Sequence, residues 1–497
     1  MSVSLLISLT LYFAAMLLIG LYAYRRSTDD VSGYLLGGRQ LGPAVTALSA
    51  GASDMSGWII MGLPGAVYLS GLGNIWIGLG LVAGAYLNYL LVAPRLRAYT
   101  EIAGDSITLP DFFENRFEDS SRLLRIVASI VIIVFFTVYT SSGLVGGGKL
   151  FENAFNQSYE MGLYITAGVV VLYTLFGGFL AVSMTDFVQG CIMFAALILV
   201  PIVAVIELGG VGPVIATVSS IDASHLWISN LSIAAVISSL AWGLGYFGQP
   251  HIIVRFMAIR SVGEIKLARR IGMSWMITCL LGAIAVGFVG IAFVFKAQVS
   301  LTDPEAIFIL LSQLLFHPFI TGFLLAAVLA AIMSTVSSQL LVTSSSLTED
   351  IYKAFLQKKA SQHQLVFVGR LSVVLVAMLA IFLAHNRDSS ILQLVSHAWA
   401  GFGAAFGPMI LLSLYWPRMT SSGALAGMVV GAATVLFWIY APITIAGQSL
   451  SQIIYAMVPG FLLSAVAIVL VSRLTQVPSE EINAAFWAME SKVKSEL

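Results

Sequence analysis

The chain has 497 residues, of which 59% are hydrophobic and 10% are charged, and its formal net charge is zero. Soluble domains carry about 25% charged residues, so this composition indicates a protein that is largely embedded in a membrane. A neutral chain also lacks the basic surface that a nucleic-acid-binding protein needs. The two cysteines, Cys191 and Cys279, form no spaced motif and predict neither a disulfide framework nor a zinc site.

Thirteen apolar segments are long enough to cross a bilayer, since a helix of about 20 apolar residues spans its core. The first of them has no basic region before it, which favours a retained helix over a cleaved leader. In chain order, the expected spans are 3–24, 43–70, 74–94, 124–147, 159–177, 186–206, 230–256, 272–295, 319–345, 366–386, 390–416, 421–441 and 451–472.

The distribution of basic residues predicts the orientation of these spans. With the N-terminus outside, every Lys and Arg falls on the cytoplasmic side except Lys149, Lys296 and Arg387. Positive charge concentrates in the cytoplasmic loops of membrane proteins, so the bias also supports the number of spans. The C-terminal tail is then cytoplasmic, and it is too short to be a catalytic domain.

The second and seventh segments contain glycine and proline clusters that interrupt a helix. Residues 51–65 read GASDMSGWIIMGLPG, and residues 242–250 read WGLGYFGQP. Glycine costs a helix about 1 kcal/mol relative to alanine and proline about 3 kcal/mol. Unwound backbone persists in a membrane only beside a protein-lined cavity. The alternative is that these glycines allow close helix packing.

The positions of the two breaks predict an internal symmetry. They fall in the first helices of two successive five-helix sets, 43–206 and 230–416, which run in opposite directions across the membrane. Broken helices at matching places in inverted repeats predict a binding site near the midplane. The remaining parts are an extra helix and loop at 1–42, two extra helices at 421–472 and the tail at 473–497.

Asp54 is the carboxylate expected nearest the centre of a span, and such residues are functional candidates by default. Its alternative role is to cap the half-helix that starts there. In the ninth segment, Ala331, Ser334 and Thr335 share one helix face and offer oxygens to a hard monovalent cation. The alternative is that both hydroxyls bond to the preceding helical turn.

Two further polar residues have ordinary explanations beside functional ones. Tyr139 lies on a membrane helix, where a lone aromatic residue usually packs. Asp186 is expected near the cytoplasmic start of a helix, where it could act as an N-cap. Asp54 has no catalytic partners in the sequence, so the chain is not expected to be an enzyme.

Four motifs, at residues 37–43, 47–58, 243–251 and 398–408, resemble the bacterial sodium/proline symporters of the sodium:solute symporter family. The resemblance runs from about residue 10 to residue 475. It implies an all-α, leucine-transporter-like fold of five plus five inverted helices in a bacterial cytoplasmic (inner) membrane. It also implies L-proline import by alternating access with sodium as the coupled ion.

The resemblance further implies roles for individual residues. Sodium would bind the carbonyls of Ala52, Met55 and Ala331 and the hydroxyls of Ser334 and Thr335, with Asp54 required for coupling. Arg39 and Asp186 match cytoplasmic-side residues. The substrate pocket would comprise Ser56, Trp58, Tyr139, Trp242, Tyr246 and Pro250. The same mechanism with a sugar, a vitamin carboxylate or an anion remains the nearest alternative, and a membrane sensor is a further one.

Overall fold

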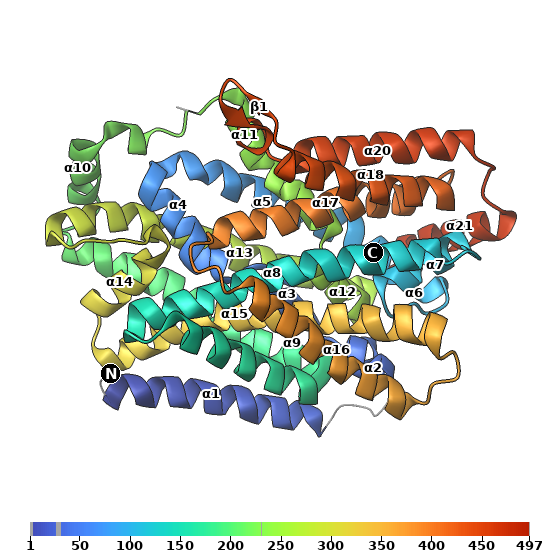
Figure 1. Cartoon of the computed structure of the whole chain (residues 1–497), viewed down its shortest axis with the longest axis horizontal. Helices are drawn as coiled ribbons and strands as arrows, with labels where there is room; N and C mark the ends of the chain where they lie inside the picture. The colour runs from blue at the N-terminus through green and yellow to red at the C-terminus, as the bar shows by residue number, and fades with distance from the viewer. Residues whose placement is uncertain (1–2, 26–30, 230, 497) are drawn as a thin grey trace.

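The structure is a computed structural model, and it describes residues 3–25, 31–229 and 231–496. The expected chain divisions that begin or end at 1, 230 and 497 therefore have a boundary outside the described residues. The described chain is a bundle of long, roughly parallel and antiparallel helices (Figure 1). Its first half contains α1 (Val3–Tyr24), α2 (Val31–Leu36), α3 (Pro43–Asp54), α4 (Leu63–Ser70), α5 (Ile75–Leu87), α6 (Ala93–Ile102), α7 (Leu109–Phe117), α8 (Leu123–Phe155), α9 (Tyr159–Glu207) and α10 (Val211–Ile221).

The second half has the same helical character, and the only sheet among the described residues is a short hairpin of β1 and β2. Its elements are α11 (Ile233–Leu240), α12 (Pro250–Ala258), α13 (Ile265–Ala297), α14 (Ile307–Leu315), α15 (Pro318–Ser345), α16 (Gln362–Leu383), α17 (Ile391–Tyr415), α18 (Ser421–Tyr440), β1 (Thr444–Ile445), β2 (Gln448–Ser449), α19 (Leu450–Ile453), α20 (Met457–Leu474) and α21 (Glu480–Glu496).

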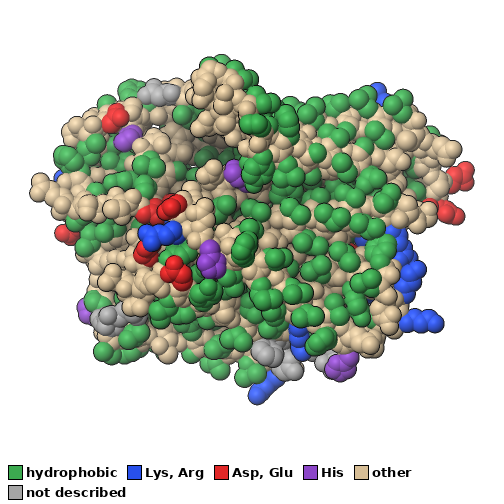
Figure 2. All heavy atoms as spheres, viewed as in Figure 1, with side chains coloured by type: hydrophobic (Ala, Val, Ile, Leu, Met, Phe, Trp, Pro, Cys, Tyr) green, Lys and Arg blue, Asp and Glu red, His purple; other side chains and the backbone are tan. Residues whose placement is uncertain are grey.

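Ten helices among the described residues are long and apolar enough to cross a membrane. The predicted count of thirteen is not confirmed, because interrupted segments such as Tyr159–Leu175 and Ile233–Gly248 are shorter than a full span. The fifth and sixth expected spans join in α9, whose helical geometry fails at Gly178 (φ 57°). Figure 2 shows hydrophobic side chains over most of one face, with basic side chains gathered at its right end.

Both predicted helix breaks are present. In the second segment, α3 ends at Asp54, and the chain resumes as the π-helical turn η2 (Trp58–Gly62) followed by α4. In the seventh segment, the tighter helix η6 (Ala241–Gly248) separates α11 from α12, which begins at Pro250. The broken segments meet, because α3 packs against α12. The fold therefore brings both stretches of irregular backbone together in the bundle interior.

The glycines near the second break also serve close packing, as the alternative predicted. A Cβ atom at Gly243 would lie 2.1 Å from the carbonyl oxygen of Gly80, and one at Gly84 would lie 2.1 Å from that of Gly243. The backbones of α5 and η6 therefore touch, which no larger residue permits. The two explanations of these glycines are compatible, since one stretch of chain is both unwound and closely packed.

The helices outside the two expected five-helix sets pack at the edges of the bundle. The first helix, α1, lies along α9 and α15, whereas α18 and α20 pair with each other and with α17 (Figure 1). The amphipathic α21 packs on α6, where Lys492 Nζ lies 2.9 Å from a carboxylate oxygen of Glu101. The core between these edges is formed mainly by α3, α8, α9, α13, α15 and α17.

Candidate functional site

The break after α3 leaves a backbone carbonyl that several groups share. The carbonyl oxygen of Asp54 accepts a hydrogen bond from the Ser56 amide at 2.9 Å, from Trp58 Nε1 at 3.2 Å and from the Tyr139 hydroxyl at 3.4 Å. Buried backbone groups that lose their helical partners need such replacements. The break is thus held open by side chains from the same segment and from α8.

The predicted sodium ligands are gathered at this break. Ser334 Oγ lies 2.8 Å from the Ala52 carbonyl oxygen and 3.2 Å from that of Ala331. Thr335 Oγ1 lies 3.5 Å and 3.3 Å from the same two oxygens. Both hydroxyls do bond to their own helix, as the alternative predicted. Bonding within α15 does not explain their contact with the Ala52 carbonyl on α3. Met55 adjoins the set as the C-cap residue that follows α3.

This arrangement suits a hard monovalent cation. Ala52, Ala331, Ser334 and Thr335 are all at most 1% exposed and contribute only oxygen atoms to the cluster. Hard cations prefer oxygen ligands, and hydroxyl and carbonyl oxygens supply partial negative charge without a fixed counter-charge. An ion between α3 and α15 would replace hydrogen bonds that now join these two helices.

The side chain of Asp54 does not cap a helix. Asp54 is the last residue of α3, and the N-cap position of the next turn is Gly57, which receives no side-chain cap. Instead, the Tyr246 hydroxyl donates to Asp54 Oδ2, which links the first broken segment to the second. The carboxylate is 2% exposed. The capping alternative is therefore wrong, and the charge needs another explanation.

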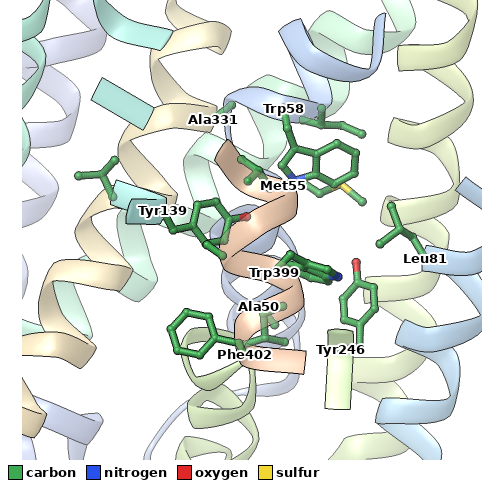
Figure 3. Close-up of a cluster of buried hydrophobic side chains, with 14 of the residues drawn as sticks. Ala50, Met55, Trp58, Leu81, Tyr139, Tyr246, Ala331, Trp399 and Phe402 are labelled. Carbon is green, nitrogen blue, oxygen red and sulfur yellow. The ribbon is translucent and has the colours of Figure 1, made fainter. Parts of the chain in front are cut away.

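Four of the six expected substrate-pocket residues lie around the first break. Ser56, Trp58 and Tyr139 are each 1% exposed, and the ring of Trp242 lies 6.4 Å from that of Trp58. Tyr246 faces the Asp54 carboxylate instead, and Figure 3 shows Trp399 between it and Tyr139. Trp399 contacts Tyr246 edge-on, with ring centroids 5.2 Å apart.

Pro250 lies apart from this aromatic group. It begins α12 and lines a small cavity together with Ile132, Val254 and Val342. The structure therefore brings together Ser56, Trp58, Tyr139 and Trp242 and places Tyr246 and Pro250 beside them rather than among them.

Tyr455, which the sequence analysis did not predict as part of the site, covers one side of the aromatic group. Trp242 stacks on Tyr455 with ring centroids 5.4 Å apart and planes 18° from parallel. The Tyr455 hydroxyl donates to the Ser396 carbonyl at 2.7 Å, and the Tyr455 amide donates to Ser238 Oγ at 3.0 Å. Both rings line an open, serine-rich cavity of about 470 Å³. The stacked pair thus separates this cavity from the buried aromatic group around Trp58.

Comparison with known proteins identifies the family. The model of the sodium:solute symporter family matches residues 34–431. The chain belongs to the sodium:solute symporter family. The predicted family is therefore confirmed, and the chain is a multi-pass membrane protein of a transport family rather than an enzyme.

Three curated relatives are similar over nearly their whole length. The osmoregulated proline transporter OpuE of Bacillus subtilis is 58% identical over 99% of both chains. The high-affinity proline transporter PutP of the same organism is 59% identical over 95% of this chain and 98% of its own. A sodium/proline symporter of Staphylococcus aureus is 54% identical over 95% of this chain and 93% of its own.

Solved structures confirm the leucine-transporter-like fold. A Na⁺-coupled sialic acid symporter in its substrate-bound, outward-open state has a TM-score of 0.81 at 20% identity, over 96% of this chain and 99% of its own. The nucleobase-cation-symport-1 transporter Mhp1 in a closed conformation has a TM-score of 0.56 at 13% identity, over 92% of this chain and 98% of its own.

Asp186 lies in α9, eight residues after the interruption at Gly178, so it does not cap a helix and the N-cap alternative is wrong. Instead, Asp186 is fully buried and forms an ion pair with Arg255 of α12 at 3.2 Å. The Arg255 guanidinium also donates to Ser49 Oγ at 3.1 Å and to Ser338 Oγ at 2.5 Å. Arg255 was missed in the sequence, although an arginine between the second break and the cytoplasmic loop is a detectable signal.

Arg39 joins three segments at the end of the bundle that was predicted to be cytoplasmic. Its guanidinium donates to the Met257 carbonyl at 2.7 Å, to the Ser106 carbonyl at 2.8 Å and to Asp105 at 2.9 Å. It therefore links the segment before α3 to the end of α12 and to the loop at 105–106.

Trp399, from the 398–408 motif, and Gln249, at the second break, make further hydrogen bonds at the site. Trp399 Nε1 donates to the Trp242 carbonyl at 2.7 Å, and Gln249 Nε2 donates to the Trp399 carbonyl at 3.1 Å. These bonds satisfy backbone groups around η6. Trp399 stands in a motif that the sequence analysis had singled out, so its importance could have been predicted from its place there.

Proposed function

We propose that this chain imports L-proline together with sodium by alternating access across a bacterial cytoplasmic membrane, with the N-terminus outside and the C-terminus inside. The observation that carries the proposal is the oxygen cluster of Ala52, Ala331, Ser334 and Thr335 at a helix break. Three relatives that are 54–59% identical are named proline transporters or sodium/proline symporters, which supports the choice of solute and ion.

Sodium between α3 and α15 would favour the outward-open state, and proline would then close the outer side over itself. Both ligands bias the same two-state element, so each raises the affinity for the other. Movement of one charge through 100 mV supplies about 2.3 kcal/mol. A tenfold sodium gradient supplies about 1.4 kcal/mol more. The two together support roughly 500-fold accumulation.

In this proposal, the chain divides into two inverted five-helix sets that alternate access and three flanking parts. The inverted sets 43–206 and 230–416 carry the two breaks, whereas 1–42, 421–472 and 473–497 lie outside the symmetric core. The distribution of basic residues supports the orientation, and the contacts of α1, α18 and α20 at the edges of the bundle support the division.

Transport by purified protein in proteoliposomes tests the proposal directly. Labelled proline should accumulate only with an inward sodium gradient, and an inside-negative potential should accelerate uptake because one net charge moves inward. Replacing sodium by potassium at equal ionic strength is the control. Sodium-independent uptake would overturn the coupling. If an excess of a sugar or vitamin displaces the best substrate and unlabelled proline does not, the solute assignment is wrong.

The ion site predicts a selective change in sodium dependence. Ser334→Ala and Thr335→Ala should each raise the half-saturating sodium concentration about fivefold, since one ligand or hydrogen bond contributes about 1 kcal/mol. Thr343→Ala is the matched control, because the Thr343 hydroxyl bonds to Gln339 O of its own helix at 2.7 Å. Sodium titrations of proline uptake make the measurement. Wild-type sodium dependence in both site variants would place the ion elsewhere.

The aromatic group predicts a selective change in proline affinity. Helix N-termini attract anions, so the amides from Met55 to Trp58 are expected to receive the proline carboxylate. The ring and ammonium would lie against Trp58, Tyr139 and Trp242. Trp242→Ala should therefore raise the half-saturating proline concentration about tenfold at saturating sodium.

Trp242→Phe serves as the control in the same uptake assay, because it keeps an aromatic face against Tyr455. The phenylalanine variant should stay within a few-fold of wild type. An alanine variant with unchanged proline dependence would remove Trp242 from the pocket.

A further inference from the structure

The C-terminal helix α21 packs against the end of the bundle that was predicted to be cytoplasmic. Phe486, Met489 and Val493 are buried, and their spacing of three and four residues places them on one face of the helix. That face lies on α6, close to α7 (Figure 1). A freely solvated tail would not bury an apolar face, so α21 is a packed part of this end of the protein.

Phe486 contacts both of the helices beneath α21. Its ring lies edge-on to the Tyr99 ring of α6, with centroids 6.3 Å apart, and the Arg116 guanidinium of α7 lies 5.6 Å from its centroid. Just before α21, Ser479 Oγ donates at 3.3 Å to the carboxylate of Glu118, the residue that follows α7. The helix α21 therefore bridges α6 and α7 rather than resting on one of them.

Two ion pairs join α21 to α6. Arg95 pairs with Glu490, and the two side chains are 17% and 16% exposed. Lys492 Nζ lies 2.9 Å from a carboxylate oxygen of Glu101. Arg95 also donates to the Leu414 carbonyl of α17 at 3.0 Å, so the first pair reaches a third helix. A partly buried pair held by a further hydrogen bond is more ordered than an exposed one, and it contributes more to stability.

The second ion pair continues inward to the end of α12. The same carboxylate oxygen of Glu101 lies 2.7 Å from Arg97 Nη1. Arg97 in turn donates to the Ile259 carbonyl at 2.7 Å and to the Arg260 carbonyl at 3.2 Å. These two residues directly follow α12, the inner half of the second broken segment. Lys492, Glu101 and Arg97 therefore form a continuous polar chain from the tail to a broken helix.

The residues after α12 are also joined to the start of α3. The Leu41 amide donates to the Ala258 carbonyl at 3.2 Å, and the Arg260 amide donates to the Leu41 carbonyl at 3.1 Å. Leu41 lies two residues before α3, which is the inner half of the first broken segment. The inner halves of both broken segments are thus tied together, and the polar chain from Lys492 ends at this tie.

The inner end of the bundle is more tightly closed than the outer end. The cavity beside the Trp242–Tyr455 pair measures about 470 Å³, whereas the one beside Pro250, which Leu109 of α7 also lines, measures about 10 Å³. Tyr139 of α8 contacts both α3 and α12, so release of a solute to the cytoplasm requires these inner halves to move away from α8. Because α6 packs on α12 and α7 packs on α8, this movement would separate the two helices that α21 bridges.

We propose that α21 is a clasp that stabilises the inward-closed state of the transporter and loosens when the solute is released to the cytoplasm. The inference rests on the proposed alternating-access mechanism and on the proposed orientation. Its contacts with α6 and α7 are complete only while these helices lie together, so weakening them shifts the population toward the inward-open state. Sodium, which favours the outward-open state in the proposed mechanism, opposes this shift.

Maleimide labelling of single cysteines in the purified full-length protein measures the two populations. In a Cys191→Ala/Cys279→Ala background, Val254→Cys reports access to the inner cavity and Ser396→Cys reports access to the outer one. Adding Glu490→Arg places like charges at the first ion pair. It should raise the labelling rate at Val254→Cys about fivefold, the effect of losing one partly buried pair, without raising the rate at Ser396→Cys.

Three further variants separate the clasp from an effect of surface charge. Glu481→Arg makes the same charge change at an exposed position of α21, so both labelling rates should equal those of the background. Arg95→Glu combined with Glu490→Arg restores opposite charges and should return the Val254→Cys rate toward the background value. Phe486→Ala removes the apolar bridge between α6 and α7 and should act in the same direction as Glu490→Arg.

Two results would overturn the clasp. Faster labelling at both reporter cysteines would indicate general loosening of the fold, and unchanged rates in both Glu490→Arg and Phe486→Ala would show that α21 does not restrain the inner end. Sodium tests the proposed function separately, since it should slow labelling at Val254→Cys when the tail is unaltered. Failure of sodium to do so would contradict the proposed coupling, whereas the clasp is judged from the tail variants alone.

Discussion

Replacing Arg255 with methionine should destabilise the protein by about 3–5 kcal/mol, because it leaves Asp186 charged and unpaired in the interior. Both side chains of the pair are fully buried, at 0% exposure. The guanidinium also donates to Ser49, to Ser338 and to the His251 carbonyl at 2.6 Å. Three helices besides α12 thus lose a shared partner. The loss of stability is measured by heating the detergent-purified protein and using size-exclusion chromatography to detect how much remains folded at each temperature.

A double variant distinguishes charge imbalance from lost packing. Asp186→Asn with Arg255→Met removes both charges, and replacing a whole buried pair is often nearly neutral. The double variant should therefore recover much of the stability that either single change loses. Arg260→Met is the surface control, since Arg260 pairs with Glu264 at 52% side-chain exposure and such pairs contribute about 0–1 kcal/mol. Equal unfolding temperatures for Arg255→Met and Arg260→Met would contradict the argument.

The architecture was largely predictable because membrane helices have strong local signals. Apolar length predicted the spans, and clustered glycine and proline predicted the breaks after Asp54 and within 242–250. Interrupted segments obscured the count, since the 43–70 and 230–256 segments each divide into several elements. The fifth and sixth expected spans correspond to two helical stretches, Tyr159–Leu175 and Gly178–Glu207, which meet at the non-helical Gly178 without a proline between them.

The sites were predictable only where a motif or helix periodicity joined their parts. Ser334 and Thr335 share a helix face, and the structure places that face against Ala52. The Asp186–Arg255 pair joins residues 69 positions apart on different helices, and no local pattern encodes such a contact.

Aromatic residues were the hardest to place. Tyr246 and Trp242 are four residues apart in η6, yet one faces Asp54 and the other faces Trp58 and Tyr455. An α-helix would bring residues at that spacing to one face. The tighter geometry of η6 separates them, and its extent was not evident from composition. Tyr455 was missed because it comes from a segment outside the inverted repeats.

Gly84→Ala should be among the most damaging small substitutions in the protein. A Cβ atom there would lie 2.1 Å from the Gly243 carbonyl oxygen and 2.5 Å from its Cα, and these backbone atoms cannot move aside as a flexible side chain can. Overpacking of this kind costs about 1–3 kcal/mol or more. It would also displace η6, so sodium-driven proline uptake should fall with the unfolding temperature.

Gly168→Ala provides the matched control within the same membrane environment. Gly168 lies in α9, and a Cβ atom there would meet nothing within 4 Å. Alanine is favoured over glycine in a helix by about 1 kcal/mol, so this variant should be as stable as wild type or more so. The same thermal unfolding assay compares the two. If Gly84→Ala unfolds at the temperature of Gly168→Ala, then α5 and η6 are not in backbone contact, and the close packing that fixes the second break is absent.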